Sequence, residues 1–245
     1  MKKWIAFWNI LLKDMRTYYL KPPNISWGII FPLAWTGMFL IRSGSGLDSI
    51  PALLPGLMAI SILFGTTSMM AVTVTFEKKN SSFDRLLLAP ISFDLLMLAK
   101  TSGAIFFGII NAIIPILLAS LITDIHVASW PLLILAVFLI ATVSTFLGLF
   151  IAIAVKEVFE AQTFSNFFRF PMIFLCGLFI PVAKLPIFLR PLSYILPLTY
   201  GVDIMQGLIR GGNVMPIPLA FAVLTAFCIL IFVLNKHFIK KRWIT

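Results

Sequence analysis

Residues 130–155 read WPLLILAVFLIATVSTFLGLFIAIAV, a stretch without a single charged side chain. A helix rises about 1.5 Å per residue, so a run of this length crosses the roughly 30 Å hydrocarbon core of a bilayer. The run lacks the alternation of apolar and polar residues that a membrane β-strand requires. Because lipid cannot satisfy free backbone polar groups, the stretch predicts a transmembrane helix.

Similar apolar runs recur along the chain, which predicts an all-α integral membrane protein with six transmembrane helices. The chain has 245 residues, of which 60% are hydrophobic and only 11% are charged. This composition lies outside the range of soluble domains. No linker or internal repeat divides the sequence, so residues 1–245 are expected to form a single transmembrane domain. The predicted spans are 25–41, 53–76, 95–122, 130–155, 164–182 and 217–234.

The basic residues are distributed unevenly between the two predicted sides of the membrane. There are 19 Lys and Arg against nine Asp and Glu, a formal net charge of +10. With the amino terminus inside, only Arg42, Lys184, Arg190 and Arg210 lie outside, in agreement with the positive-inside rule. We therefore expect a multi-pass protein of the cell (plasma or inner) membrane with both termini cytoplasmic. The basic residues then contact membrane lipid headgroups, and no nucleic-acid partner is expected.

The amino-terminal segment, residues 1–23, is predicted to be an interfacial amphipathic helix. Its apolar and polar residues repeat with helical periodicity, and a proline pair ends it before the first span. A basic amphipathic helix that carries tryptophan lies most simply in the membrane interface. The pattern is equally compatible with an additional contact to a cytoplasmic partner. The apolar face comprises Trp4, Trp8, Leu11, Met15 and Tyr18, and Asn9, Lys13 and Arg16 lie opposite.

Residues 76–92, FEKKNSSFDRLLLAPIS, are the most polar stretch in the middle of the chain. Ser81 or Ser82 can cap a helix, and Asp84 lies early enough to favour the helix dipole. Residues 77–92 are therefore predicted to contain a short amphipathic helix on the cytoplasmic surface, shaped for a partner's groove. The alternative is a helix that rests in the lipid interface. The apolar face comprises Phe83, Leu86 and Leu87, the solvated face comprises Lys78, Lys79 and Arg85, and Pro90 ends the helix.

A proline-rich segment, residues 183–212, precedes the last predicted span. It is too apolar for a solvated loop, and its prolines remove backbone donors and interrupt helices. Residues 185–210 are expected to form short helices that dip into or lie on the outer leaflet. The prolines of this segment are Pro186, Pro191 and Pro197.

The sequence carries no recognisable enzymatic or metal-binding chemistry. There is no GxxxxGK[ST] phosphate-binding loop, and no Cys, His and acid cluster has the spacing of metal ligands. We predict no catalytic, cofactor-binding or metal residue, and hence a protein that is not an enzyme. Apart from Arg169 the interiors of the predicted spans are essentially uncharged, and Lys100 lies near the start of its span. Arg169 is interpreted as an arginine that snorkels to the interface, or else as a charge in a substrate path. Energy for active transport must then come from another subunit.

Three groups of residues form motifs that occur together in one known family. The first group is Glu77, Lys78, Arg85, Leu86, Leu87, Pro90, Ile91, Ser92 and Lys100. The second is Gly177, Phe179, Pro181, Leu185 and Pro186, and the third is Pro197, Leu198, Thr199, Tyr200, Asp203 and Arg210. In these motifs the chain resembles the type 2 permeases of ATP-binding-cassette (ABC) exporters, a family that includes drug- and antibiotic-resistance and polysaccharide exporters. The chain departs from the family where Ser81 and Ser82 replace a frequent Gly-Thr.

The resemblance implies a six-span permease that dimerises, preferably with a second copy of itself, and binds two ATPase subunits. ATP and Mg would be held by those partners, with no cofactor in this chain. The implied substrate is hydrophobic or amphipathic: a drug, a lipid-like molecule or a polysaccharide. The alternatives are a membrane scaffold that recruits a cytoplasmic partner and an ATP-independent carrier or channel. The implied ATPase-coupling residues are Glu77, Lys78, Phe83, Asp84, Arg85, Leu86, Leu87 and Pro90. The implied outer re-entrant motif comprises Pro186, Pro197, Thr199, Tyr200, Asp203 and Arg210.

Overall fold

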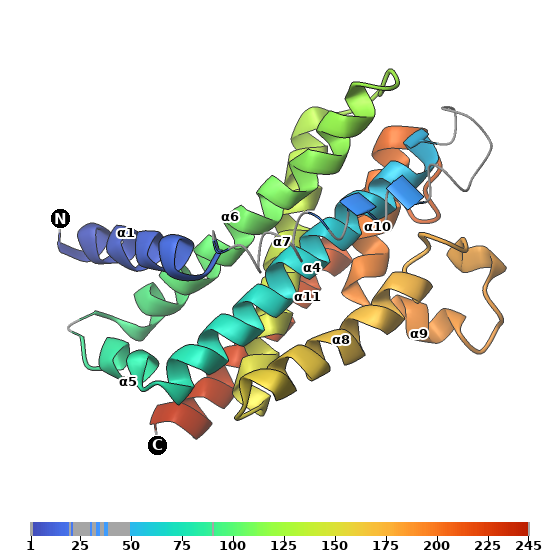
Figure 1. Cartoon of the computed structure of the whole chain (residues 1–245). Coiled ribbons are helices and arrows are strands. Elements are labelled where there is room, and N and C mark those ends of the chain that lie inside the picture. The colour runs from blue at the N-terminus through green and yellow to red at the C-terminus, as the bar shows by residue number, and fades with distance from the viewer. Residues whose placement is uncertain are drawn as a thin grey trace.

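The computed structural model describes residues 2–19, 21, 30, 33–34, 37–38, 50–89 and 91–244. Every regular element within these ranges is a helix (Figure 1). The prediction of an all-α protein is therefore confirmed for the part of the chain that the structure describes. The first predicted span, 25–41, lies largely outside the described residues.

Four long apolar helices form the body of the protein, and each is long and apolar enough to cross a membrane. They coincide with four of the predicted spans. The helix at the second predicted span extends beyond the predicted bounds at both ends. At its carboxyl end it continues through the charged residues that follow Phe76. The four helices are α4 (Ile50–Lys79), α6 (Phe93–Ser120), α7 (Trp130–Ala154) and α11 (Ile217–Ile239).

Helix α8 (Val158–Leu175) occupies the place of the fifth predicted span but is shifted towards the amino terminus. A capping box explains its early start, because the Glu157 and Glu160 side chains accept hydrogen bonds from each other's backbone N–H groups. It ends shortly before Gly177, whose φ of +88° is a conformation that favours glycine. Helix α8 lies along the edge of the bundle beside α4 (Figure 1).

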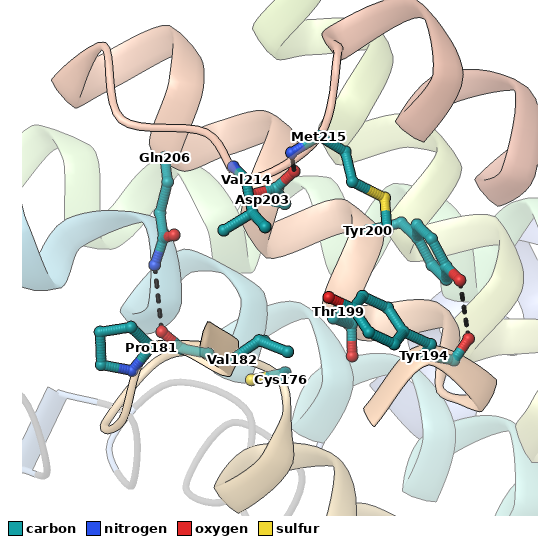
Figure 2. Close-up of a pocket in the computed structure, with 11 residues that line it drawn as sticks. Cys176, Pro181, Val182, Tyr194, Thr199, Tyr200, Asp203, Gln206, Val214 and Met215 are labelled. Carbon is teal, nitrogen blue, oxygen red and sulfur yellow. Dashed lines mark hydrogen bonds between the residues drawn. The ribbon is translucent and has the colours of Figure 1, made fainter. Parts of the chain in front are cut away.

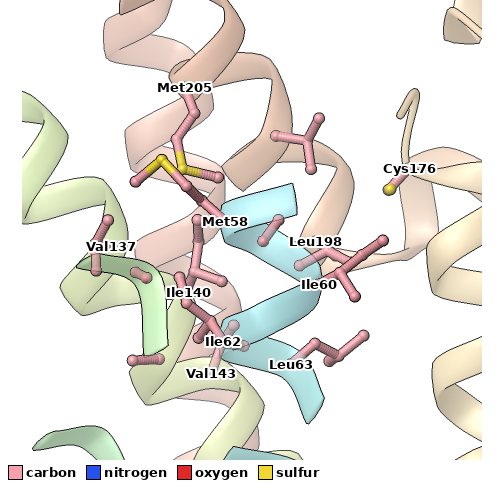
Figure 3. Packing of buried hydrophobic residues seen from close by; sticks show 14 of the residues in the cluster. Met58, Ile60, Ile62, Leu63, Val137, Ile140, Val143, Cys176, Leu198 and Met205 are labelled. Carbon is pink, nitrogen blue, oxygen red and sulfur yellow. The ribbon is translucent and has the colours of Figure 1, made fainter. Parts of the chain in front are cut away.

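Helix α4 is the centre of the bundle and is buried on nearly all sides, packing against α6, α7, α8 and the shorter α10 (Pro197–Arg210). Met58 and Ile62 of α4 meet Ile140 of α7 and Met205 of α10 in the apolar core (Figure 3). A helix that is apolar on all faces suits this position.

Small residues let these helices approach closely. A Cβ atom on Gly148 of α7 would lie 2.4 Å from the Thr67 backbone oxygen of α4. Likewise, a Cβ on Gly65 would lie 1.9 Å from Nδ2 of Asn111 in α6. Because glycine has no side chain, the backbones of two helices can approach each other closely at these contacts, as in other membrane bundles.

Short helices lie at the two ends of the bundle. Helix α5 (Ser82–Leu87) follows α4, and this end, here called the α5 end, also holds the end of α11 with its extension η5 (Lys240–Ile244). The opposite end, here called the α10 end, holds the turn η4 (Val182–Lys184), helix α9 (Arg190–Ile195) and α10. Helix α1 (Lys2–Asp14) and its extension η1 (Met15–Tyr19) pack across α6 (Figure 1).

Candidate functional site

Helix α5 forms where the sequence predicts it, but its start differs from the expectation. Neither serine side chain caps the helix, and Ser81 instead adopts a left-handed conformation with φ of +54°. The backbone closes the turn: the Ser81 N–H donates to the Lys78 carbonyl at 3.0 Å and the Asn80 N–H to the Phe76 carbonyl at 3.1 Å. This tight turn fixes α5 directly beneath the end of α4.

Two residues expected on the partner-facing surface are buried within the chain, which corrects that prediction. Glu77 is 0% exposed and Phe83 is 1% exposed. The Phe83 ring packs edge-on against Trp243, with centroids 4.9 Å apart, and Lys78 Nζ lies 4.5 Å from the same indole. Because Phe83 fills the space between α5 and η5, it anchors α5 to its own chain. The role of Trp243 was not foreseen from the sequence.

The remaining surface of α5 is open to a partner. Asp84 and Arg85 are exposed, Leu86 and Leu87 are half-buried, and Leu88 is 86% exposed. A groove of about 440 Å³ beside them is lined mainly by apolar residues. Pro90 lies outside the described residues. The lining residues are Asp84, Leu86, Leu87, Leu88, Ile91, Phe93, Leu96 and Trp243.

Glu77 belongs to an ion cluster formed by Lys13, Asp14, Glu77 and Lys100, here called the buried ion cluster because all its members except Lys13 are buried. Lys100 Nζ lies 2.9 Å from Asp14 Oδ2 and also pairs with Glu77, while Lys13 Nζ lies 2.5 Å from Glu77 Oε1. The cluster joins α1, α4 and α6, and its two carboxylates balance its two ammonium groups. The sequence offers one signal for it, since Asp14 is the only acidic residue before position 48.

Burial governs the ionisation of the groups around this cluster. It raises the pKa of Asp14 above 3.8, because loss of solvent outweighs the attraction of Lys100 and because Glu77 adds repulsion. Burial, together with the nearby carboxylates, also raises the pKa of Tyr18 to about 12. The pKa of the buried Tyr19 is raised well above its usual value for the same reasons. Both phenols stay neutral beside the ion cluster at physiological pH.

Arg169 is buried, with 2% of its surface exposed, so the interpretation as a snorkelling arginine is wrong. Its Nη2 donates to Ser68 Oγ of α4, and its Nε donates to the Ser165 carbonyl at 3.2 Å. The guanidinium carbon lies 4.4 Å from the centre of the Phe64 ring. The polar hydroxyl and the aromatic face together hold the cation between α8 and α4, so it cannot extend to the interface.

At the α10 end, hydrogen bonds organise the predicted outer motif. The helix breaks at Pro197, and the Thr199 hydroxyl donates back across the break to the Ser193 carbonyl at 2.6 Å. Tyr200 OH donates to the Tyr194 carbonyl at 2.7 Å (Figure 2). These two bonds hold α9 against α10, and α10 itself is inserted among α4, α7 and α11.

Asp203 ties α10 to the turn that leads into α11. Its two carboxylate oxygens accept hydrogen bonds from the backbone N–H groups of Val214 and Met215, at 2.7 and 3.0 Å. Figure 2 shows these residues around a small pocket of about 30 Å³, close to the volume of one water molecule. Arg210 is exposed in the last turn of α10, and Pro186 precedes α9. The pocket is too small for a substrate, so these residues shape the end of the bundle.

Comparison with known proteins gives the family of this architecture. Residues 5–209 match the ABC-2 type transporter family, and the chain belongs to that family. Membership indicates the transmembrane subunit of an ABC transporter, which works with ATP-binding ATPase subunits. The apolar helices accordingly belong to a multi-pass membrane protein.

Two curated relatives from Escherichia coli K12 show how far the likeness extends. The chain is 22% identical to the inner membrane transport permease YadH over 246 residues, which cover 97% of this chain and 96% of YadH. It is 26% identical over 194 residues to the probable multidrug ABC transporter permease YbhS. That second match covers 78% of this chain and 51% of YbhS.

Proposed function

We propose that the chain is the transmembrane subunit of an inner-membrane ABC exporter that moves a hydrophobic or amphipathic substrate outward. Two copies form the pathway, and two separate ATPase subunits supply the energy from ATP and Mg. The relatives YadH and YbhS, an inner membrane transport permease and a probable multidrug ABC transporter permease, support this assignment. Both termini and the α5 end face the cytoplasm in this proposal, in keeping with the charge distribution.

The observation that carries the proposal is the surface of α5. This helix is fixed from within by Phe83, while Asp84 and Arg85 are exposed and an apolar groove lies beside them. An amphipathic helix of this kind fits a groove of a folded partner. Because the sequence lacks a phosphate-binding loop, an ATPase is the partner that the transport activity requires.

Movement of a docked ATPase reaches the membrane helices through a tight turn, a buried ion cluster and a weaker surface ion pair. Helix α5 joins α4 through the tight turn at Ser81, and the buried ion cluster joins α4 to α1 and α6. Lys79 at the end of α4 also pairs with Glu157 at the start of α8, at 2.6 Å. A displacement of α5 therefore tilts a set of helices together, as in other rigid-body transitions of domains.

The outer and interfacial helices complete the proposed transporter. Helix α9 and the buried α10 form the outer re-entrant segment, which closes the pathway at the outer leaflet. Helix α1 lies in the interface with Trp4 and Trp8, which are 68% and 55% exposed, turned towards lipid. Its opposite face is fixed to α6 by Ile10 and Asp14.

The test is reconstitution of the purified chain in vesicles with a candidate ABC ATPase from the same organism. We expect the two proteins to copurify and the vesicles to move substrate only when ATP is present on the ATPase side. Screening drugs and lipids for stimulation of ATP hydrolysis separates an exporter from a scaffold, since a scaffold shows no substrate dependence. Uphill transport by the chain alone would refute the proposal.

A further inference from the structure

Arg169 is a buried cation that has no acidic partner in the described part of the chain. Among the residues that the structure describes, no carboxylate lies within 4 Å of its guanidinium. Its partners are a hydroxyl, a carbonyl and an aromatic ring, all of them neutral. Burial of a charge is costly unless an opposite charge accompanies it, so an ion without one indicates a functional position.

The depth of Arg169 follows from the two helices that enclose it. Helices α4 and α8 are joined at their ends by the pair of Lys79 and Glu157. Ser68 precedes Lys79 by about three turns, and Arg169 follows the start of α8 by about three turns, which is roughly 16 Å in each helix. In a hydrocarbon core of about 30 Å, this places the guanidinium near the middle of the membrane.

Beside the apolar packing of α8 on α4, two polar contacts join the helices, and both can be exchanged. The Lys79–Glu157 pair is half-exposed, and exposed pairs of this kind contribute little to stability. Ser68 and Ser165 offer only neutral acceptors to Arg169. An anionic ligand that replaced them would form stronger, charge-assisted hydrogen bonds with the planar fork of the guanidinium.

The opposite side of α8 carries exposed aromatic rings. Phe167, Phe170 and Phe174 are 70%, 51% and 55% exposed, and they surround the level of Arg169 along the helix. Helix α8 therefore combines a single buried cation on one face with an aromatic surface on the other. A ligand with one anionic group and an apolar body matches both features.

We propose that Arg169 binds the anionic headgroup of an amphipathic substrate when α8 moves away from α4, while the apolar body lies against the phenylalanine face of α8. This assignment rests on the proposed export function and narrows its substrate to anionic amphiphiles. An uncharged amphiphile gains no charge-assisted bond at this site, and a cationic one is repelled.

The test compares three probes that differ only in the headgroup. Each carries the same NBD-labelled dodecyl chain, with a sulfonate, an uncharged glycerol ether or a trimethylammonium head. Fluorescence anisotropy in a nonionic detergent measures their affinity for the purified full chain, alone and with its ATPase and a non-hydrolysable nucleotide. In at least one of these states we expect the sulfonate to bind about tenfold more tightly than the glycerol ether. This is the difference in affinity that one hydrogen bond to a charged group contributes.

Variants separate binding from a structural role of the arginine. Arg169→Gln is expected to abolish the preference for sulfonate while leaving affinity for the uncharged probe unchanged, and Arg169→Lys is expected to retain part of it. Arg16→Gln, which removes an exposed arginine elsewhere, serves as the matched control and keeps the preference. If Arg169→Gln does not fold, Arg169→Lys is measured instead. The inference predicts a reduced preference for sulfonate in this variant, whereas a purely structural role of the cation predicts the same headgroup preference as in the wild type.

The outcomes also distinguish this inference from the proposed function. Equal affinity for all three probes in the wild-type chain, or a sulfonate preference that survives in Arg169→Gln, overturns the inference even where the ATPase is coupled. Failure of any ATPase to bind overturns the export function, whereas the affinities of the chain alone for the three probes are measured without the ATPase and test the inference separately.

Discussion

Asp14 and Lys100 form a buried ion pair of 2.9 Å, although 86 positions separate them in the sequence. Each side chain is 1% exposed. The pair fixes the amino-terminal helix α1 to the membrane helix α6, and Glu77 adds α4 to the same contact. The amino-terminal helix is therefore a fixed part of the bundle, in addition to any contact that it makes with lipid.

Replacement of Lys100 by methionine should destabilise the protein strongly. The change leaves Asp14 and Glu77 as neighbouring buried carboxylates without their shared cation. Removing one partner from a buried pair costs about 3–5 kcal/mol. We expect a large fall in the apparent Tm of the purified protein, measured by the intrinsic fluorescence of its tryptophans during heating.

Two variants serve as controls for this prediction. Lys79→Met removes the cation of the half-exposed pair with Glu157, for which a loss of about 1 kcal/mol or less is expected. The combination of Lys100→Met with Glu77→Gln removes one orphaned charge and should recover part of the lost stability. Equal effects of Lys100→Met and Lys79→Met would show that the cluster contributes no more than a surface pair.

The raised pKa of Asp14 predicts a pH dependence with a definite sign. The folded protein holds the proton of Asp14 more tightly than the unfolded chain, whose carboxyl has a pKa near 3.8. The stability contributed by Asp14 is thus complete below that value and is lost as the pH rises through the raised pKa. Asp14→Asn cannot ionise and should avoid this loss.

The measurement is the apparent Tm of wild type and Asp14→Asn between pH 4 and pH 8. The Tm of the variant minus that of the wild type should increase with pH. A difference that stays constant, or that decreases as the pH rises, would contradict a raised pKa. Because asparagine retains an oxygen that can accept from Lys100, α1 should remain docked in the variant.

The long helices could be predicted from the sequence because length and composition alone determine them in a membrane. The uncharged run at 130–155 becomes α7 with nearly the same bounds, Trp130–Ala154. Helix α5 was also predictable, since its apolar spacing and flanking charges are local features. The break at Pro197 followed from the missing backbone donor.

The partners of the charged residues could not be predicted in this way. The family resemblance assigned Glu77, and local periodicity assigned Phe83, to a contact surface, whereas tertiary contacts with Lys13 and Trp243 bury them. Such contacts join residues that are far apart in the sequence and leave no periodic signal. The same applies to Arg169, because its position in the sequence fits an interfacial arginine and only the packing of α8 on α4 reveals its burial.

The contact of Gly148 with α4 should not accommodate a side chain. A Cβ atom there would lie 2.4 Å from the Thr67 carbonyl oxygen and 3.0 Å from Met70 Cβ, so α7 must move away from α4. For Gly148→Ala we expect a loss of about 1–3 kcal/mol through overpacking, measured as a lower Tm. Gly212→Ala is the matched control, since no atom lies within 4 Å of its added Cβ. Equal Tm values for the two variants would argue against a close contact of α4 and α7.

Charge reversal on α5 should disrupt coupling to the ATPase without unfolding the chain. Among the described residues, the Arg85 guanidinium has long hydrogen-bond contacts only, 3.4 Å to the Asn80 carbonyl and 3.5 Å to the Ser82 hydroxyl. Arg85→Glu should therefore leave membrane insertion and Tm unchanged while weakening ATPase binding about tenfold or more, through lost charge complementarity. Pull-down of the ATPase from titrated mixtures measures this change.

The control for Arg85→Glu is Lys184→Glu, which reverses an exposed charge at the α10 end. It should leave ATPase affinity intact. Glu77→Lys provides a contrast, because it places a third cation in the buried ion cluster. We expect this variant to lower Tm, so that any loss of ATPase affinity follows from destabilisation of the fold. Unchanged ATPase affinity in Arg85→Glu would exclude this residue from the partner surface.

Removal of the Asp203 carboxylate should loosen the turn between α10 and α11. Its two oxygens accept from the backbone N–H groups of Val214 and Met215, and hydrogen bonds to a charged group contribute about 1.5–3 kcal/mol each. In Asp203→Ala both amides lose their acceptor, so hydrogen exchange at residues 214 and 215 should accelerate by about tenfold or more. Mass spectrometry of peptides that cover 211–217 measures the exchange. Asp124→Ala, which removes an exposed carboxylate at the same end of the bundle, should leave these peptides unchanged; slow exchange that persists in Asp203→Ala would mean that helix packing alone orders the turn.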